Sequence, residues 1–156
     1  MIPIFFKCSK HKELCSYCED FISFARDKKL NYSIGGSLAY HIYFNKAYRP
    51  IKDLDVKIDS KEKASWIPFF EEQFIKRKAR YKDTIWKTDL IFKSYWQFNN
   101  DKLICEMWAL PDPYKTILVN NIWVDLPSEM YKNKLNYNRD KDIQDIKYYN
   151  LERFRV

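Results

Sequence analysis

The spacing of apolar residues along the chain takes two forms, one of which predicts helices and the other strands. Intervals of three and four residues, as at Leu14, Tyr17, Cys18, Phe21 and Ile22, predict a helix over residues 13–29. Strict alternation of apolar and charged residues over 51–58 predicts a strand with one buried face. Further strands are expected at 31–34, 81–92, 102–109 and 116–124, the last with a turn at Asn120-Asn121. Further helices are expected at 38–47, 61–78, 127–135 and 139–153.

These elements together predict an α+β fold, a small mixed β-sheet with helices packed on it. The length of 156 residues favours one domain over residues 1–156, in which 1–30 form an N-terminal arm and helix. Pro68 falls inside the helix expected at 61–78, so it should kink or restart that helix.

Glycine is rare in this chain, and its placement is informative. An average chain of this length carries about eleven glycines, whereas this one has two, the neighbours Gly35 and Gly36. They lie between an expected strand and an expected helix, where a backbone without Cβ atoms lets amide groups approach a phosphate at the helix N-terminus. Ser37 would donate its hydroxyl or cap the helix. A plain turn is the alternative interpretation.

Asp53 and Asp55 lie on the strand expected at 51–58, and alternation directs both carboxylates to one face. Two like charges side by side are unfavourable unless a cation lies between them. Oxygen ligands of this kind suit Mg²⁺ or Mn²⁺, which bind the phosphates of a nucleotide. The alternative is that this face is only solvated.

The two signals occur in a fixed order: Ile34-Gly35-Gly36-Ser37, a helix, and then Asp53-Leu54-Asp55. This order resembles the nucleotidyltransferase superfamily with its polymerase-β-like fold. It is similar in particular to small stand-alone members such as the abortive-infection toxin transferases and the lincosamide nucleotidyltransferases. The resemblance implies transfer of a nucleoside monophosphate from a nucleoside triphosphate to an acceptor hydroxyl, with release of pyrophosphate.

The resemblance also implies roles for individual residues. Asp53 and Asp55 would hold two divalent cations, and Gly35, Gly36 and Ser37 would bind phosphates. Arg49 and Lys52 would neutralise phosphate charge. A third carboxylate would complete the metal site and act as the base, for which the candidates are Glu106, which we favour, and Asp89. Residues 126–134 and 139–147 resemble the closing helices of these transferases, with Asp142 and Asp145 one turn apart.

Charge favours phosphate-bearing partners, because Lys and Arg (28) outnumber Asp and Glu (21) and give a net charge of +7. The acceptor could be RNA, a protein, as in toxin–antitoxin systems, or a small molecule. The alternative function is a non-catalytic module of the same fold that binds a nucleotide, RNA or a partner protein. No apolar run is long enough to span a membrane and no signal peptide is evident, so we expect a cytoplasmic monomer or homodimer.

Cysteine spacing raises the separate possibility of a structural Zn²⁺ site. Cys8, His11, Cys15 and Cys18 have gaps of two, three and two residues, typical of zinc ligands. Cys18, however, also lies on the apolar stripe of the first helix, where a cysteine is often a small buried apolar residue. Both interpretations stay open at this point.

Overall fold

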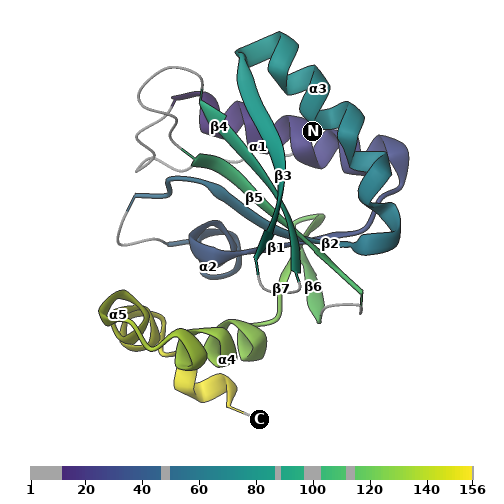
Figure 1. Cartoon of the computed structure of the whole chain (residues 1–156). Coiled ribbons are helices and arrows are strands. Elements are labelled where there is room, and N and C mark those ends of the chain that lie inside the picture. The colour runs from purple at the N-terminus through teal and green to yellow at the C-terminus, as the bar shows by residue number, and fades with distance from the viewer. Residues whose placement is uncertain (1–11, 47–49, 87–88, 97–102, 112–114, 156) are drawn as a thin grey trace.

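The computed structural model describes residues 12–46, 50–86, 89–96, 103–111 and 115–155, and its fold is α+β, as expected (Figure 1). The strands are β1 (Tyr32–Gly35), β2 (Leu54–Asp59), β3 (Ala79–Trp86), β4 (Asp89–Trp96), β5 (Leu103–Leu110), β6 (Thr116–Val119) and β7 (Ile122–Asp125). The α-helices are α1 (Lys12–Lys28), α2 (Gly36–Phe44), α3 (Lys63–Arg77), α4 (Pro127–Tyr137) and α5 (Asp140–Tyr149). Two short 3₁₀ helices are η1 (Ser60–Glu62) and η2 (Leu151–Phe154).

The strands form one mixed sheet in the order β3-β4-β5-β2-β1-β7-β6. β1 runs antiparallel to β2 and parallel to β7, while β2 runs parallel to β5. Figure 1 shows α1 and α3 together near one end of the molecule and α4 and α5 together near the other. The centre of the sheet, β5-β2-β1, therefore brings together segments that are distant in the sequence.

The alternating pattern of β2 separates a core face of the sheet from an open face. Leu54, Val56 and Ile58 have no exposed surface, whereas Asp55 and Lys57 between them are half-buried. Aromatic side chains of α1 and α3 contribute to the core, where Phe21 stacks on Trp66 with ring centroids 4.8 Å apart. Burial of large aromatic surfaces of this kind is a main source of the free energy of folding.

Three predicted elements differ from the observed ones. The strand expected at 81–92 is two strands, because β3 and β4 form a hairpin that pairs Trp86 with Asp89. Pro68 does not interrupt α3, since it removes one hydrogen bond while the buried Trp66, Phe69 and Phe70 hold the helix against the core. The helix expected at 139–153 is α5 followed by η2, because Asn150 ends α5 in the left-handed conformation with φ of 50°.

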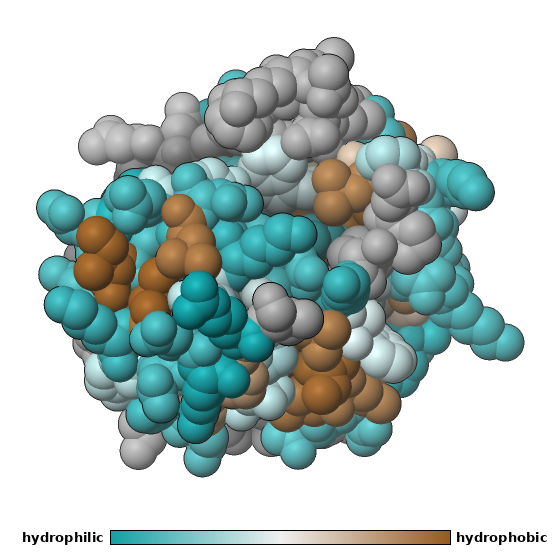
Figure 2. Space-filling view, turned by 90° about the horizontal axis from the view of Figure 1, so that it is seen from below, coloured by the Kyte–Doolittle hydropathy of each residue, from teal (hydrophilic) through white to brown (hydrophobic). Residues whose placement is uncertain are grey.

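Other predicted elements agree closely with the structure. The segment expected as strand 116–124 with a turn at Asn120-Asn121 is the β6–β7 hairpin, whose turn asparagines both have positive φ. Among the described residues, no helix has the length and apolar character needed to cross a membrane. Viewed from below, the surface is largely hydrophilic, with apolar residues in separate patches (Figure 2).

Candidate active site

Strand register places three of the predicted site residues level with one another on three adjacent strands. Asp55 of β2 is paired with Gly35 of β1 on one side and with Glu106 of β5 on the other. Asp53 directly precedes β2. Gly35, Asp55 and Glu106 thus form one row across the centre of the sheet, although 71 residues of sequence separate the first from the last.

Burial and neighbouring negative charges act on the carboxyl groups of Asp53 and Asp55. Burial, followed by the negative charge of Glu106, raises the pKa of Asp53 to about 6. Burial, followed by the charges of Asp53 and Glu106, raises the pKa of Asp55 to about 7. Both shifts mean that the ionised carboxylates are unfavourable as they stand, and a bound cation would relieve the repulsion.

Each glycine makes room for a carboxylate of the protein itself. A Cβ at position 36 would lie 3.3 Å from Oδ2 of Asp55, and Gly36 has a φ of +61°, which side chains disfavour. A Cβ at position 35 would lie only 2.8 Å from Oδ2 of Asp125. The sequence suggested that both glycines clear space for a ligand, whereas the structure shows that Gly35 directly accommodates Asp125.

Asp125, at the end of β7, is a site residue that sequence reasoning missed. It is 3% exposed, and its two carboxylate oxygens have different partners. Oδ1 accepts a hydrogen bond of 2.5 Å from the Ser33 hydroxyl, and Oδ2 forms an ion pair of 2.8 Å with Lys57 Nζ. Burial raises the pKa of Asp125, although Lys57 acts to lower it. The available signal was a single acid at the end of an apolar strand, directly before Leu126 and Pro127.

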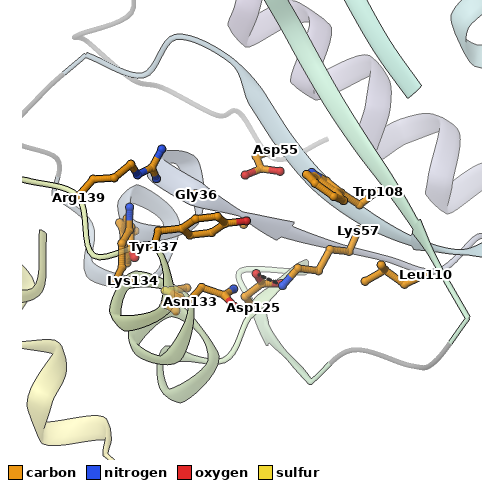
Figure 3. A pocket seen from close by; sticks show the side chains of 13 residues that line it. Gly36, Asp55, Lys57, Trp108, Leu110, Asp125, Asn133, Lys134, Tyr137 and Arg139 are labelled. Carbon is orange, nitrogen blue, oxygen red and sulfur yellow. Dashed lines mark hydrogen bonds and ion pairs between the residues drawn. The ribbon is translucent and has the colours of Figure 1, made fainter. Parts of the chain in front are cut away.

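A cavity of about 250 Å³ lies between the open face of the sheet, α2 and α4 (Figure 3). The strands contribute Asp55, Lys57, Trp108, Leu110 and Asp125, α4 contributes Met130, Asn133, Lys134 and Tyr137, and the residue before α5 is Arg139. Gly35, Gly36 and Tyr40 complete the lining. In Figure 3, Lys134 and Arg139 lie on one side of the cavity and Lys57 and Trp108 on the other.

Two buried acids of α5 fix the cations at the α4 side of this cavity. Lys134 Nζ lies 3.0 Å from Oδ1 of Asp142 and 2.7 Å from Oδ2 of Asp145. Arg139 Nε lies 2.7 Å from Oδ2 of Asp142. Burial acts to raise the pKa of Asp142, but the hydrogen bonds from Arg139 and Lys134 hold it well below its usual range. These acids are therefore structural anchors rather than part of an exposed, salt-bridged helix.

The other residues predicted to contact the nucleotide, Ser37, Lys52 and Arg49, differ in their exposure and in whether the structure describes them. Ser37 is half-buried in the first turn of α2. The N-cap of this helix is Gly35, so Ser37 is not the capping residue. Lys52 is exposed, and its charge acts to lower the pKa of Asp53 against the effect of burial. Arg49 lies outside the described residues.

The two candidates for the third carboxylate occupy different places in the sheet. Glu106 is level with Asp55. The residue of β4 level with Glu106 is Lys93, whereas Asp89 begins β4 four residues away and pairs with Trp86. Four residues of a strand span about 13 Å. The register thus brings Glu106, and not Asp89, beside the Asp pair.

The cysteine candidates for zinc are only partly described. Cys8 and His11 lie outside the described residues. Cys15 is half-buried on α1, and Cys18 has no exposed surface within the hydrophobic core. Burial raises the pKa of the Cys18 thiol well above its ordinary value, as expected for a cysteine that packs as an apolar residue.

The donors of the central row suit a hard divalent cation. In the described part of the chain, no three Cys, His, Asp or Glu side chains form a metal cage by themselves. Magnesium rarely needs such a cage, because it keeps water ligands and binds one or two carboxylates together with substrate phosphates. Asp53 and Asp55, with Glu106 beside them, fit that mode of binding.

Solved structures of other proteins share this fold at low sequence identity. The antibiotic-resistance factor ANT(2″)-Ia, solved with adenylyl-2″-tobramycin, aligns with a TM-score of 0.63 and 12% identity over 90% of this chain and 87% of that chain. A putative nucleotidyltransferase from Thermotoga maritima aligns with a TM-score of 0.54 and 17% identity over 90% and 94%. The Megavirus polyadenylate synthase aligns with a TM-score of 0.58 and 17% identity over 80% of this chain and 26% of that chain.

No family model and no curated protein sequence matches this chain. The structural matches nevertheless agree with one another on the fold. The chain has the nucleotidyltransferase fold that its sequence motifs suggested.

Proposed function

We propose that this chain is a metal-dependent nucleotidyltransferase that moves a nucleoside monophosphate from a nucleoside triphosphate to an acceptor hydroxyl. The observation that carries this proposal is the row of Gly35, Asp55 and Glu106 across β1, β2 and β5, with Asp53 and Gly36 adjoining it. Solved structures of the same fold include one whose ligand is an adenylylated acceptor and another of a polyadenylate synthase, which supports nucleotidyl transfer as the reaction class.

Asp53 and Asp55, with Glu106, are the residues that would hold Mg²⁺ or Mn²⁺. When bound, such cations stabilise charge on both the attacking and the leaving oxygen of an in-line displacement. Burial, followed by the charges of their acidic neighbours, raises the pKa values of Asp53 and Asp55 to about 6 and about 7, and a bound cation would offset both effects. Metal binding would return both groups to the ionised form at neutral pH.

The triphosphate would be held from two sides. Amide groups at the N-terminus of α2, around Gly36 and Ser37, offer hydrogen bonds and a favourable dipole to phosphate oxygens. Lys134 and Arg139 line the cavity from the side of α4 and α5 and carry the positive charge that a leaving pyrophosphate requires. Lys52 and Arg49 are further candidates for phosphate contacts.

In the transfer step, the acceptor oxygen bonds to the α-phosphorus while the bond from this phosphorus to the bridging oxygen of the β-phosphate breaks. Glu106 would receive the acceptor proton. Strand order supports the in-line direction: the glycine turn, where the phosphates bind, is on β1, and Glu106 is on β5, with the Asp pair of β2 between them. The acceptor therefore approaches from the β5 side.

The test is incubation of the purified chain with Mg²⁺, each labelled nucleoside triphosphate and separate pools of RNA, protein and small-molecule acceptors. We expect pyrophosphate release and label in one pool, both lost in Asp53→Asn/Asp55→Asn. Asp59→Asn is the matched control, because Asp59 is on the same strand, caps η1 and lies outside the cavity lining. Triphosphate binding by the wild type without any release of pyrophosphate would instead indicate a non-catalytic binding module.

A further inference from the structure

The half of the cavity away from Lys134 and Arg139 has its own chemistry. Along β2 and β5, the pair that follows Asp55 and Glu106 on the open face is Lys57 and Trp108, which are level with each other. Two residues of a strand span about 7 Å, the size of one nucleoside unit. Figure 3 shows Trp108 and Lys57 lying side by side on the side of the cavity opposite Lys134 and Arg139.

Lys57 is held in this half rather than free to extend into solvent. Its Nζ atom lies 2.8 Å from Oδ2 of Asp125, and its side chain is 23% exposed. Asp125 is fixed in turn by the Ser33 hydroxyl and by the space that Gly35 leaves. The result is an aromatic ring and a positioned ammonium group that lie two residues further along β5 and β2 than Glu106 and Asp55.

We propose that Trp108 and Lys57 form the acceptor subsite and that the acceptor is the 3′ end of a single-stranded RNA. This inference rests on the proposed transferase function. An aromatic surface stacks on a base of any sequence, and a neighbouring cation contacts the backbone phosphate. The net charge of +7 favours the same polyanionic partner.

Three cations, Lys57, Lys134 and Arg139, line the cavity. Each is ion-paired with an acid of the protein: Lys57 with Asp125, Lys134 with Asp142 and Asp145, and Arg139 with Asp142. Positive charge inside the cavity is thus largely balanced. The feature of the cavity that favours RNA is the aromatic ring of Trp108, because such a ring stacks on a base.

The first experiment measures binding of a fluorescein-labelled oligoribonucleotide of about 12 nucleotides with a free 3′-hydroxyl, by fluorescence anisotropy without triphosphate. Trp108→Leu should weaken binding about tenfold, while Trp108→Phe, which keeps a stacking ring, should restore most of the affinity. Trp123→Leu is the matched control, because Trp123 is also partly exposed (41%) but lies on β7, outside the cavity lining. Thermal unfolding checks that each variant is folded.

A second variant tests Lys57 without leaving Asp125 unpaired. Lys57→Gln/Asp125→Asn removes both charges together and should lower the slope of log affinity against log salt by about one. An unchanged slope together with unchanged affinity in Trp108→Leu would overturn the inference. Saturable binding of tobramycin that is lost in Trp108→Leu would overturn it in favour of an amino-sugar acceptor.

Failure of this inference can be told apart from failure of the proposed function. If the wild type releases pyrophosphate in a Mg²⁺-dependent manner but binds no RNA, the proposed transferase function is supported and the proposed RNA subsite is wrong. If the wild type binds RNA through Trp108 but neither binds nor consumes any triphosphate, the transferase proposal falls, and with it the assignment of that RNA as an acceptor.

Discussion

Asp55 shows at the scale of one residue how the candidate site opposes the stability of the fold. Its side chain is half-buried on the open face of β2, beside Asp53 and Glu106, and its pKa is raised to about 7 by burial and by these neighbours. An unfolded chain has an ordinary aspartate pKa of about 3.9. Between these two values the folded state binds more protons than the unfolded state, so the folded state loses stability as the pH rises.

Without divalent cations, we therefore expect the free energy of unfolding to fall between about pH 4 and pH 7 through Asp53 and Asp55. Asp55→Asn should raise the stability at about pH 8 by about 1–3 kcal/mol and should have little effect at about pH 4, where the carboxyl is protonated. Urea denaturation in EDTA measures both values. Equal stability of the variant and the wild type at high pH would contradict the electrostatic account.

The two glycines allow a double-mutant test of which side chain each one accommodates. Gly35→Ala should cost about 2 kcal/mol, because its Cβ would meet Asp125 Oδ2 at 2.8 Å. In an Asp125→Ala background the same change should cost at least about 1 kcal/mol less, since the obstructing carboxylate is gone.

Gly36→Ala is the control for this cycle. Its cost arises from the φ of +61° and from contact with Asp55, so Asp125→Ala should not relieve it. Chemical denaturation of the four Gly35/Asp125 combinations gives the interaction energy. Strict additivity would show that Gly35 is glycine for a reason other than Asp125.

At the scale of elements, the junction between α4 and α5 depends on one buried acid. Asp142 accepts the backbone N–H of Arg139 at 3.0 Å and ion pairs from Arg139 and Lys134, while its own side chain is inaccessible. A single carboxylate thus caps α5, joins it to α4 and positions both cations that line the cavity. Loss of this acid leaves two cations beside Asp145 with less negative charge to balance them.

Asp142→Ala should therefore lower the free energy of unfolding by about 3 kcal/mol and raise the KM for the nucleoside triphosphate. Because the pKa of Asp142 is depressed in the folded state, its contribution is fully present above about pH 4 and is lost as the pH falls below this value. Asp140→Ala, on the exposed side of the same helix, should change stability by less than about 1 kcal/mol. Equal effects of the two substitutions would contradict the anchoring role.

Local sequence patterns were sufficient to predict most helices and strands, but they did not predict every turn between them. The alternation of β2 and the helical spacing of α1 predicted both elements within a few residues, because burial on one face imposes that spacing. The β3–β4 hairpin was predicted as one strand, because the sequence between the two strands contains no glycine that would indicate a turn. Gly36 and Asp55 could be selected as candidates from the sequence because the motifs that contain them are defined by residues close together in the chain.

Asp125 could not be predicted in this way. Its partners Lys57 and Ser33 are 68 and 92 residues distant in the sequence. Only the strand order β2-β1-β7 brings them together. A lone acid at a strand end has no periodic signal, so its role becomes visible only in three dimensions. The position of Trp108 in the cavity lining was equally unpredictable, because in the sequence it is one more aromatic residue of an apolar strand.

For the whole molecule, the sheet separates stability from chemistry on its two faces. The core face packs against aromatic residues of α1 and α3, and the open face carries the carboxylates and the cavity. Substitutions on the core face should change the free energy of unfolding and leave the binding constants of the folded protein unaltered.

Trp66 provides the test at this scale. Trp66→Ala should cost about 3–5 kcal/mol because it removes a large buried ring that stacks on Phe21. Trp66→Phe should cost clearly less, since among the described residues the buried indole Nε1 has no hydrogen-bond partner to lose. Both variants, studied below their melting temperatures, should keep the wild-type KM for triphosphate. A raised KM would show that the two faces are coupled.

The contact between Gly35 and Asp125 also constrains how this chain can vary over generations. Any homologue that retains the carboxylate at position 125 in this geometry must retain glycine at position 35, because no Cβ fits 2.8 Å from that oxygen. A homologue that gains a side chain at position 35 must first shorten residue 125, and Lys57 then loses its counter-charge. Positions 35, 57 and 125 are thus expected to change as a group, in a fixed order of substitution.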